Sequence, residues 1–325
     1  MLAYIIRRIL YAIPILIGVN LITFVLFFVV NSPNDMARVH LGVKHVTQEA
    51  IDKWKAERGY DKPLLVNSQA PGLQKLTDTI FYDKSVALFA FKFGRADDGR
   101  DIGLDISQRM WPSLAIALPT LIIGILVNLT FALLMAFFRA TYIDIWGVVL
   151  CVVLMSISGL FYIIGGQYLI SKLWHIVPIS GYGTGIDALK FIMLPVIIGV
   201  LGGIGAGSRL YRTFFLEEIG KDYVRTARAK GLSEARVLFR HVLKNAMIPI
   251  LTGVVVVLPT LFMGSLIMES FFGIPGLGSY TIDAIQSQDF AIVRAMVFLG
   301  SVLYIIGLIL TDISYTLVDP RVRLA

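Results

Sequence analysis

Six uncharged, apolar stretches constrain the fold of this chain more than any other feature. Each reaches or approaches the roughly 20 residues that an α-helix needs to cross a bilayer. The composition agrees, because 57% of the 325 residues are hydrophobic, 16% are charged and the mean hydropathy is +0.78. We therefore expect an all-α integral membrane protein with six transmembrane helices. The stretches are Ile9–Val30, Pro112–Phe138, Ile145–Ser171, Phe191–Ser208, Ala246–Met268 and Ala295–Thr311, the last continuing past Asp312 to Val318.

The first stretch follows Arg7 and Arg8, an arrangement that also begins secretory signal peptides. Its uncharged run is longer than the apolar core of a usual signal peptide, and no small-x-small cleavage site follows it. We interpret it as a retained first span.

Lys and Arg residues in the loops predict the orientation, because cytoplasmic loops carry an excess of both. The long loop after the first span is left out of the count, since the bias does not govern long loops. With a cytoplasmic N-terminus, the inner segments hold 14 Lys and Arg residues and the short outer loops hold three, namely Lys172, Lys190 and Arg294. We therefore expect both termini on the cytoplasmic side of the membrane.

The first outer loop, residues 31–111, is long enough to have structure of its own. Thr47 is placed to cap a helix that buries Ile51 and Trp54 and stops at Gly59. The stretch Gly72–Phe93 has the apolar pattern of a helix at the membrane surface. The loop is either a small cap packed on itself or a contact for a delivery protein.

Several residues inside the spans are candidates for a structural or a functional role. The fourth span carries Gly199, Gly203 and Gly207 on one helix face, which predicts close helix packing; a gating or dimer seam is the alternative. Asp312 is the one acid near a membrane core, and we expect a structural ion pair with Arg321 or the loop arginines rather than a transport role. Uncharged polar residues predict interhelical hydrogen bonds or the lining of an aqueous path. They are Asn20, Asn128, Ser156, Ser158 and Gln167.

The residue patterns of several kinds of active site are missing from the sequence. It contains no Gly-x4-Gly-Lys-Ser/Thr loop, no His-Glu-x-x-His and no Gly-x-Ser-x-Gly. The lone cysteine, Cys151, excludes an intrachain disulfide and a cysteine-based metal site. We therefore predict no catalytic residues, no metal site and no cofactor on this chain, and we attribute its net charge of +7 to cytoplasmic loops rather than to nucleic-acid binding.

Between the fourth and fifth apolar stretches lies a basic segment that cannot cross a bilayer, Lys221–Pro249. From Arg209 to Asn245 the chain has nine Lys and Arg residues against four acids. Good helix formers end at Gly231, and Ser233 is placed to cap a second helix with Val237, Leu238 and Val242 on one face. The segment is predicted to be a bent pair of short cytoplasmic helices with Gly231 at the elbow.

This segment also resembles the signature of a known family. Its sequence TARAKGLSEARVLFRHVLKNAMIP is similar to the cytoplasmic EAA loop of the permease subunits of ABC importers, nearest to the dipeptide, oligopeptide and nickel branch. Where the general motif has Glu-Ala-Ala, this chain has Arg225, Thr226 and Ala227. The opening of the chain, the Pro-Gly-Leu-Gly turn within Phe272–Phe290 and the ending from Asp312 to Arg323 are similar to the same family.

The resemblance implies a type I ABC importer permease fold and the subunits that accompany it. It implies a second homologous permease subunit, two ATP-binding subunits that hold ATP-Mg, and an external solute-binding protein. In this arrangement residues 1–30 form the N-terminal transmembrane helix, 31–111 an external loop region, and 112–325 a five-helix permease core with a cytoplasmic coupling loop at 209–249. Membrane lipid is the remaining partner, and the location is the inner membrane.

The implied function is transport of di- or oligopeptides, with ATPase closure coupled to alternating access through the helix pair. We expect Ala227, Ala229 and Gly231 to give the pair its shape, and Arg225, Lys230 and Arg236 to make polar contacts with the ATPase. The solute stays open among dipeptides, oligopeptides, glutathione-like compounds and nickel chelates, as does homodimer against heterodimer.

Two other classes of protein are weighed against this one. An ion-gradient-driven secondary transporter or channel is expected to place several ionisable residues in mid-membrane, whereas these spans offer only Asp312 near an end. A membrane-bound enzyme is disfavoured because no catalytic constellation is present.

Overall fold

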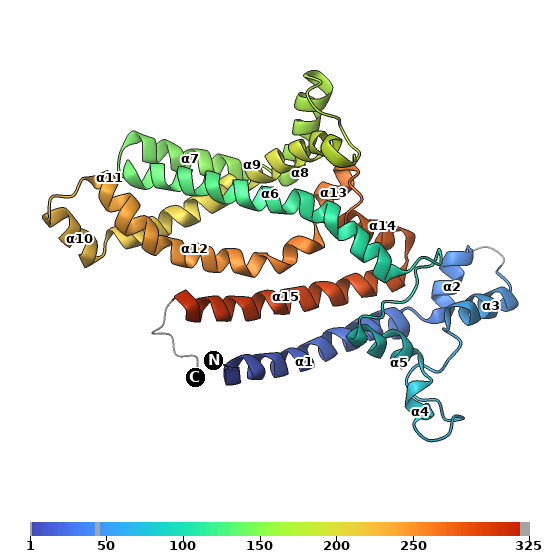
Figure 1. Cartoon of the computed structure of the whole chain (residues 1–325). Helices are drawn as coiled ribbons and strands as arrows, with labels where there is room; N and C mark the ends of the chain where they lie inside the picture. The colour runs from blue at the N-terminus through green and yellow to red at the C-terminus, as the bar shows by residue number, and fades with distance from the viewer. Residues whose placement is uncertain (1, 43–45, 319–325) are drawn as a thin grey trace. The chain divides into compact units, whose positions relative to one another are not determined.

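The computed structural model describes residues 2–42 and 46–318, and in this part of the chain the regular secondary structure is helical, with one isolated bridge between Arg95 and Asp101 (Figure 1). In chain order the helices are α1 (Leu2–Phe24), η1 (Val25–Val30), α2 (Pro33–Leu41), α3 (Gln48–Arg58), α4 (Gln74–Thr77), α5 (Ile80–Lys84), η2 (Val86–Ala90), α6 (Ile102–Phe137), α7 (Tyr142–Ser156), α8 (Gly159–Gly166), η3 (Gln167–Leu173), η4 (Gly185–Asp187), α9 (Ala188–Ile219), α10 (Asp222–Ala229), α11 (Glu234–Val237), η5 (Leu238–Val242), α12 (Leu243–Val257), η6 (Pro259–Met263), α13 (Leu266–Phe272), α14 (Leu277–Ser287) and α15 (Phe290–Val318).

The predicted all-α membrane fold is confirmed. Among the described residues, five helices are long and apolar enough to cross a membrane: Ile6–Val30, Ile102–Phe137, Gly185–Ile219, Glu234–Met263 and Phe290–Ser314. The remaining predicted span, Ile145–Ser171, is a pair of helices, Tyr142–Ser156 and Gly159–Leu173, bent by 86° between them. Hydropathy predicted the length of this run but not the bend.

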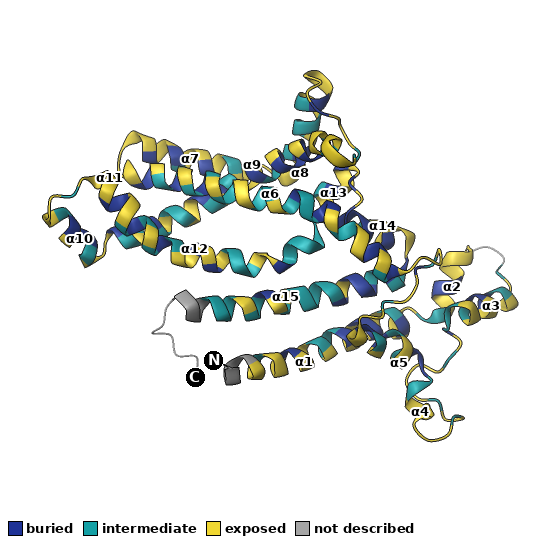
Figure 2. Ribbon diagram, in the orientation of Figure 1, coloured by how far each residue is buried: buried dark blue, intermediate teal, exposed yellow. Residues whose placement is uncertain are grey.

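The chain forms two compact units, each described by itself. The first contains residues 1–108 and 280–309, and therefore α1, the outer loop helices and most of α15. Its core is a cluster of side chains from α1, η1 and the outer loop, including Phe24, Phe28, Trp54 and Ile80. Figure 2 shows the exposed residues that run along α1, which are mostly apolar, as expected of a helix that faces lipid.

The helix predicted after Thr47 is confirmed, and the stretch after Gly72 differs from its prediction. Thr47 Oγ1 accepts a hydrogen bond from the Ala50 amide (3.4 Å), and the helix ends at Gly59, whose φ is 66°. The stretch Gly72–Phe93 forms three short helices, α4, α5 and η2, instead of one.

Of the described residues, the second unit contains 109–279 and 310–318, and two buried clusters lie in it. One lies near the ends of α6, α9 and α12, around Phe215 and Val242. The other lies around Leu194 and Phe272. Of the polar span residues, Asn128 accepts a hydrogen bond from Ser208 Oγ (3.0 Å), so it links α6 to α9.

Candidate functional site: the bent helix pair of residues 221–249

The bent helix pair (residues 221–249) forms because its sequence has one strong stop signal between two helix-forming runs. α10 covers Asp222–Ala229, with Asp222 in its first turn, where an acid is favourable. Gly231 follows with φ 77°, a left-handed conformation that glycine adopts without steric cost. Leu232 N donates to Ala227 O (3.4 Å), and Gly231 N donates to Arg228 O (2.8 Å), which closes the end of α10.

The second half of the pair starts directly after the elbow. Ser233 has extended backbone angles and α11 begins at Glu234, as predicted, but the Ser233 side chain makes no capping hydrogen bond. The chain continues through a π-helical turn, η5, into α12. Since α12 belongs to the fifth span, the pair and that span are one continuous structure.

A bidentate ion pair spans the elbow. Arg228 Nε lies 2.7 Å from Glu234 Oε1, and Arg228 Nη2 lies 3.1 Å from Glu234 Oε2. Parallel bonds between a guanidinium and a carboxylate fix geometry as well as distance. The ion pair therefore links α10 to α11 across Gly231.

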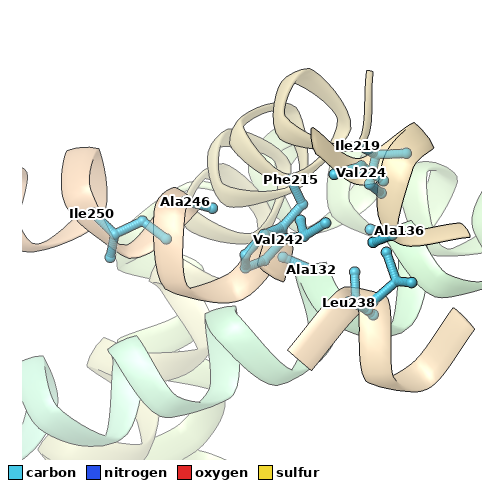
Figure 3. Close-up of a cluster of buried hydrophobic side chains, with 11 residues drawn as sticks. Ala132, Ala136, Phe215, Ile219, Val224, Leu238, Val242, Ala246 and Ile250 are labelled. Carbon is cyan, nitrogen blue, oxygen red and sulfur yellow. The ribbon is translucent and has the colours of Figure 1, made fainter. Parts of the chain in front are cut away.

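An apolar cluster attaches the pair to the ends of three spans (Figure 3). Val224 and Ala227 come from α10, while Val237, Leu238 and Val242 come from the second half of the pair. They pack against Ala132 and Ala136 of α6 and Phe215 and Ile219 of α9, and all of these residues are buried. Because protein interiors are close-packed, the pair and the ends of these spans form one packed junction.

Polar contacts strengthen the same junction. Tyr223 donates its hydroxyl hydrogen bond to Glu218 Oε2 at the end of α9 (2.5 Å). Burial, with a smaller contribution from this bond, raises the pKa of Tyr223 to about 12. Arg212 forms a bidentate pair with the buried Asp144 of α7, at 2.7 and 2.8 Å, which links α9 to the start of α7.

The structure separates the six residues predicted for ATPase coupling, three for shape and three for polar contacts, into two groups. Ala227 is buried in the cluster. The other five residues are exposed on the outside of the pair: Arg225, Ala229, Lys230, Gly231 and Arg236. Phe239 is also exposed on the pair, with 60% of its surface accessible. It was not among the predicted residues, although its position beside Leu238 places it off the buried face.

Two of the three glycines on the predicted glycine face lie in close contact with α6. A Cβ atom at Gly199 would lie 2.7 Å from Thr120 Cγ2, and one at Gly207 would lie 2.3 Å from Asn128 Nδ2. Gly203 has nothing within 4 Å. Asp312 lies in α15, and Arg321, its expected partner, lies outside the described residues.

A second feature of this unit is an apolar pocket of about 300 Å³ that ends at a buried glutamate. Glu269 is 1% exposed; its carboxylate accepts hydrogen bonds from the Ser265 and Ser279 amides, both at 3.1 Å. Burial raises the pKa of Glu269, against the hydrogen bonds that it accepts. In the described part of the chain no group of three or more His, Cys, Asp or Glu side chains is arranged to hold a metal ion.

Comparisons with known proteins match nearly the whole chain. The family described as "Binding-protein-dependent transport system inner membrane component" matches residues 116–324, and the N-terminal part of a binding-protein-dependent transport system membrane component matches residues 1–86. A candidate peptide transport system permease of Brucella abortus (strain 2308) is 31% identical over 329 residues, 99% of each chain. The dipeptide transport system permease of Escherichia coli (strain K12) is 29% identical over 99% of each chain. The oligopeptide transport system permease of Bacillus subtilis (strain 168) is 26% identical over 99% of this chain and 100% of that protein.

Proposed function

The chain belongs to the family of binding-protein-dependent transport system inner membrane components, and on that premise we propose that it couples ATP hydrolysis on partner subunits to the import of di- or oligopeptides. The fold is that of type I ABC importer permeases, and the chain is a multi-pass inner membrane protein. The observation that carries the coupling proposal is the bent helix pair, packed against three spans and exposing cationic side chains on its outside.

The proposed mechanism uses the pair as a rigid lever. Two ATP-binding subunits hold ATP-Mg and close on each other, each gripping one permease through its helix pair. The cluster around Phe215 and Val242 then passes the displacement to α6, α9 and α12. Packed interfaces shift between discrete arrangements, so the spans alternate between outward-open and inward-open states.

The peptide class follows from the relatives. Three relatives that align with this chain along nearly its whole length are named for peptide, dipeptide or oligopeptide transport. We extend that substrate class to this chain, together with an external solute-binding protein that delivers the peptide and a second homologous permease.

Replacement of Gly231 by Glu tests the coupling proposal. A side chain is strained at φ 77°, and the added charge would lie on the surface that the ATPase grips. We expect the reconstituted complex to lose peptide uptake. Either peptide no longer stimulates ATP hydrolysis, or the ATPase no longer co-purifies with the permease.

Gly185→Glu is the matched control, because Gly185 has φ 63° and open space around it but lies in an outer loop of the same unit. Normal uptake by the Gly231 variant would falsify the coupling proposal. Uptake by the chain in vesicles without ATP-binding subunits, driven by an ion gradient, would instead establish the secondary-transporter class.

A further inference from the structure

One stretch of the first outer loop, residues 80–91, packs along the first span rather than beyond its outer end. α5 and η2 follow the loop helices α2 and α3, yet they pack on the last turns of α1, before the six residues of η1 that complete the span (Figure 1). Asn20 Nδ2 donates to Ser85 O at 2.8 Å, and the rings of Phe24 and Phe81 meet edge to face at 5.0 Å. Asn20 precedes the end of the span at Val30 by ten residues, or about 15 Å of helix. Half of the roughly 30 Å hydrocarbon thickness is about the same length.

The last span gives an independent measure of the same depth. The Phe298 ring lies 5.4 Å from the ring of Phe89 and 6.4 Å from that of Phe91. Phe298 follows the start of α15 at Phe290 by eight residues, or about 12 Å of helix. Contacts with the first and last spans, all within one unit, therefore place residues 80–91 beside the outer half of both.

Two polar side chains inside the spans hold the end of α5 at this level. The last carbonyls of a helix have no partner within it. Asn20 donates to the carbonyl of Ser85, and Arg294 Nη1 lies 3.4 Å from the carbonyl of Lys84. Both side chains are buried, at 5% and 4% exposure. A cation at a helix C-terminus is also favourable electrostatically.

The backbone of this stretch meets the requirement of a membrane environment, where unpaired amides and carbonyls are costly. Ser85 N donates to Phe81 O (2.9 Å), Phe91 N to Leu88 O (2.9 Å) and Lys92 N to Ala87 O (3.1 Å). The two charged side chains of α5 interact with residues that precede it in the first outer loop. Asp83 pairs with Lys62 at 2.7 Å, and Lys84 Nζ lies 5.2 Å from the centre of the Tyr60 ring.

Apolar side chains of the same stretch are left uncovered. Tyr82, Val86, Phe89 and Phe91 are 42%, 37%, 40% and 57% exposed. The turn η1, which directly follows Phe24, also exposes apolar side chains, among them Val25, Leu26 and Val29. We propose that residues 80–91 are a re-entrant segment that lies in the outer leaflet, where its exposed apolar face contacts lipid acyl chains and where Asn20 and Arg294 anchor it. A water-borne partner does not reach that depth, and the exposed apolar face continues that of the neighbouring η1, so we assign the occupant as lipid.

Spin labels report this depth directly. In a Cys151→Ala background the full transporter is labelled with a nitroxide at Val86→Cys or Tyr82→Cys and placed in nanodiscs of phosphatidylethanolamine and phosphatidylglycerol. Glu49→Cys, on an exposed site of α3 in the same unit, is the control. We expect the ratio of collisions with oxygen to collisions with a water-soluble nickel chelate to be severalfold higher at 86 and 82 than at 49.

Each other outcome overturns the proposal. Equal ratios at 86 and 49 would place the segment in water. Shielding of 86 from both reagents would place it against another protein rather than lipid.

The anchor is tested in the same system. Asn20→Ala removes the side-chain donor and leaves the Ser85 carbonyl only the Leu88 amide at 3.3 Å, so the label at 86 should shift towards nickel accessibility. Asn128→Ala, which removes a buried asparagine of the other unit, should leave the label unchanged. An unchanged label in the folded Asn20 variant would overturn the anchoring role.

Discussion

The buried carboxylate of Glu269 leaves no room for a side chain at two neighbouring glycines. Cβ atoms at Gly264 and Gly276 would lie 2.0 and 2.2 Å from its carboxylate oxygens. Ser113 accepts the Leu277 amide (2.8 Å) on the same side, so the turn after α13 is folded tightly around this one acid. A carboxylate surrounded by amide donors stabilises a turn that no apolar contact could hold.

Replacing Gly276 by Ala should therefore destabilise the protein. The new methyl group would meet Glu269 and Ser113, both of them buried, and overpacking of this kind costs about 1–3 kcal/mol. The midpoint of thermal unfolding in nanodiscs measures the loss. Gly253→Ala is the control, since nothing lies within 4 Å of that position and Ala favours the helix. An equal midpoint for the two variants would contradict the crowding.

The raised pKa of Glu269 predicts the pH dependence of stability. Between the ordinary value of 4.5 and the raised value, the folded state binds more protons than the unfolded state. Stability from this group is thus complete below 4.5 and is lost as pH rises through the folded pKa. We expect the unfolding midpoint of the natural protein, relative to Glu269→Gln, to fall as pH rises across that window. A constant difference between the two proteins would refute the raised pKa.

At the scale of elements, the sequence predicts what depends on local pattern. Long uncharged runs predicted the spans, and the helix stop at Gly231 and the buried face of Val237, Leu238 and Val242 agree with the structure. The 86° bend after Ser156 was not predictable, because hydropathy measures length and carries no direction. Arg294 was counted as an outer loop residue, but it lies inside α15, where it donates to the carbonyl of Phe290 in its own helix and to that of the distant Lys84.

The ion pair across the elbow should contribute little to global stability and more to local order. Arg228 and Glu234 side chains are 30% and 61% exposed, and pairs of this kind contribute about 0.2–1 kcal/mol. We expect Glu234→Gln to speed amide hydrogen exchange between Gly231 and Val237 while leaving α3 unchanged. Unchanged exchange at the elbow would show that the apolar cluster alone fixes the angle.

For the whole molecule, the predicted orientation has a direct test. The loop charges place the bent helix pair inside the cell and the first outer loop outside. In the Cys151→Ala background, Lys230→Cys should react with an impermeant maleimide only after the membrane is opened, whereas Glu49→Cys should react in intact cells. The reverse pattern would contradict both the orientation and the docking of ATPases at the pair.

The two side chains that anchor the end of α5, those of Asn20 and Arg294, lie far apart in the sequence, so the ribosome makes them at different times. The Lys84 carbonyl is synthesised 210 residues before the arginine that binds it. While the last span is still unmade, Asn20 is the one of the two anchoring side chains that is available to that end of α5. The outer loop therefore completes its fold late, after the final helix has entered the bilayer, and a nascent chain stopped before residue 290 would carry an unfinished loop.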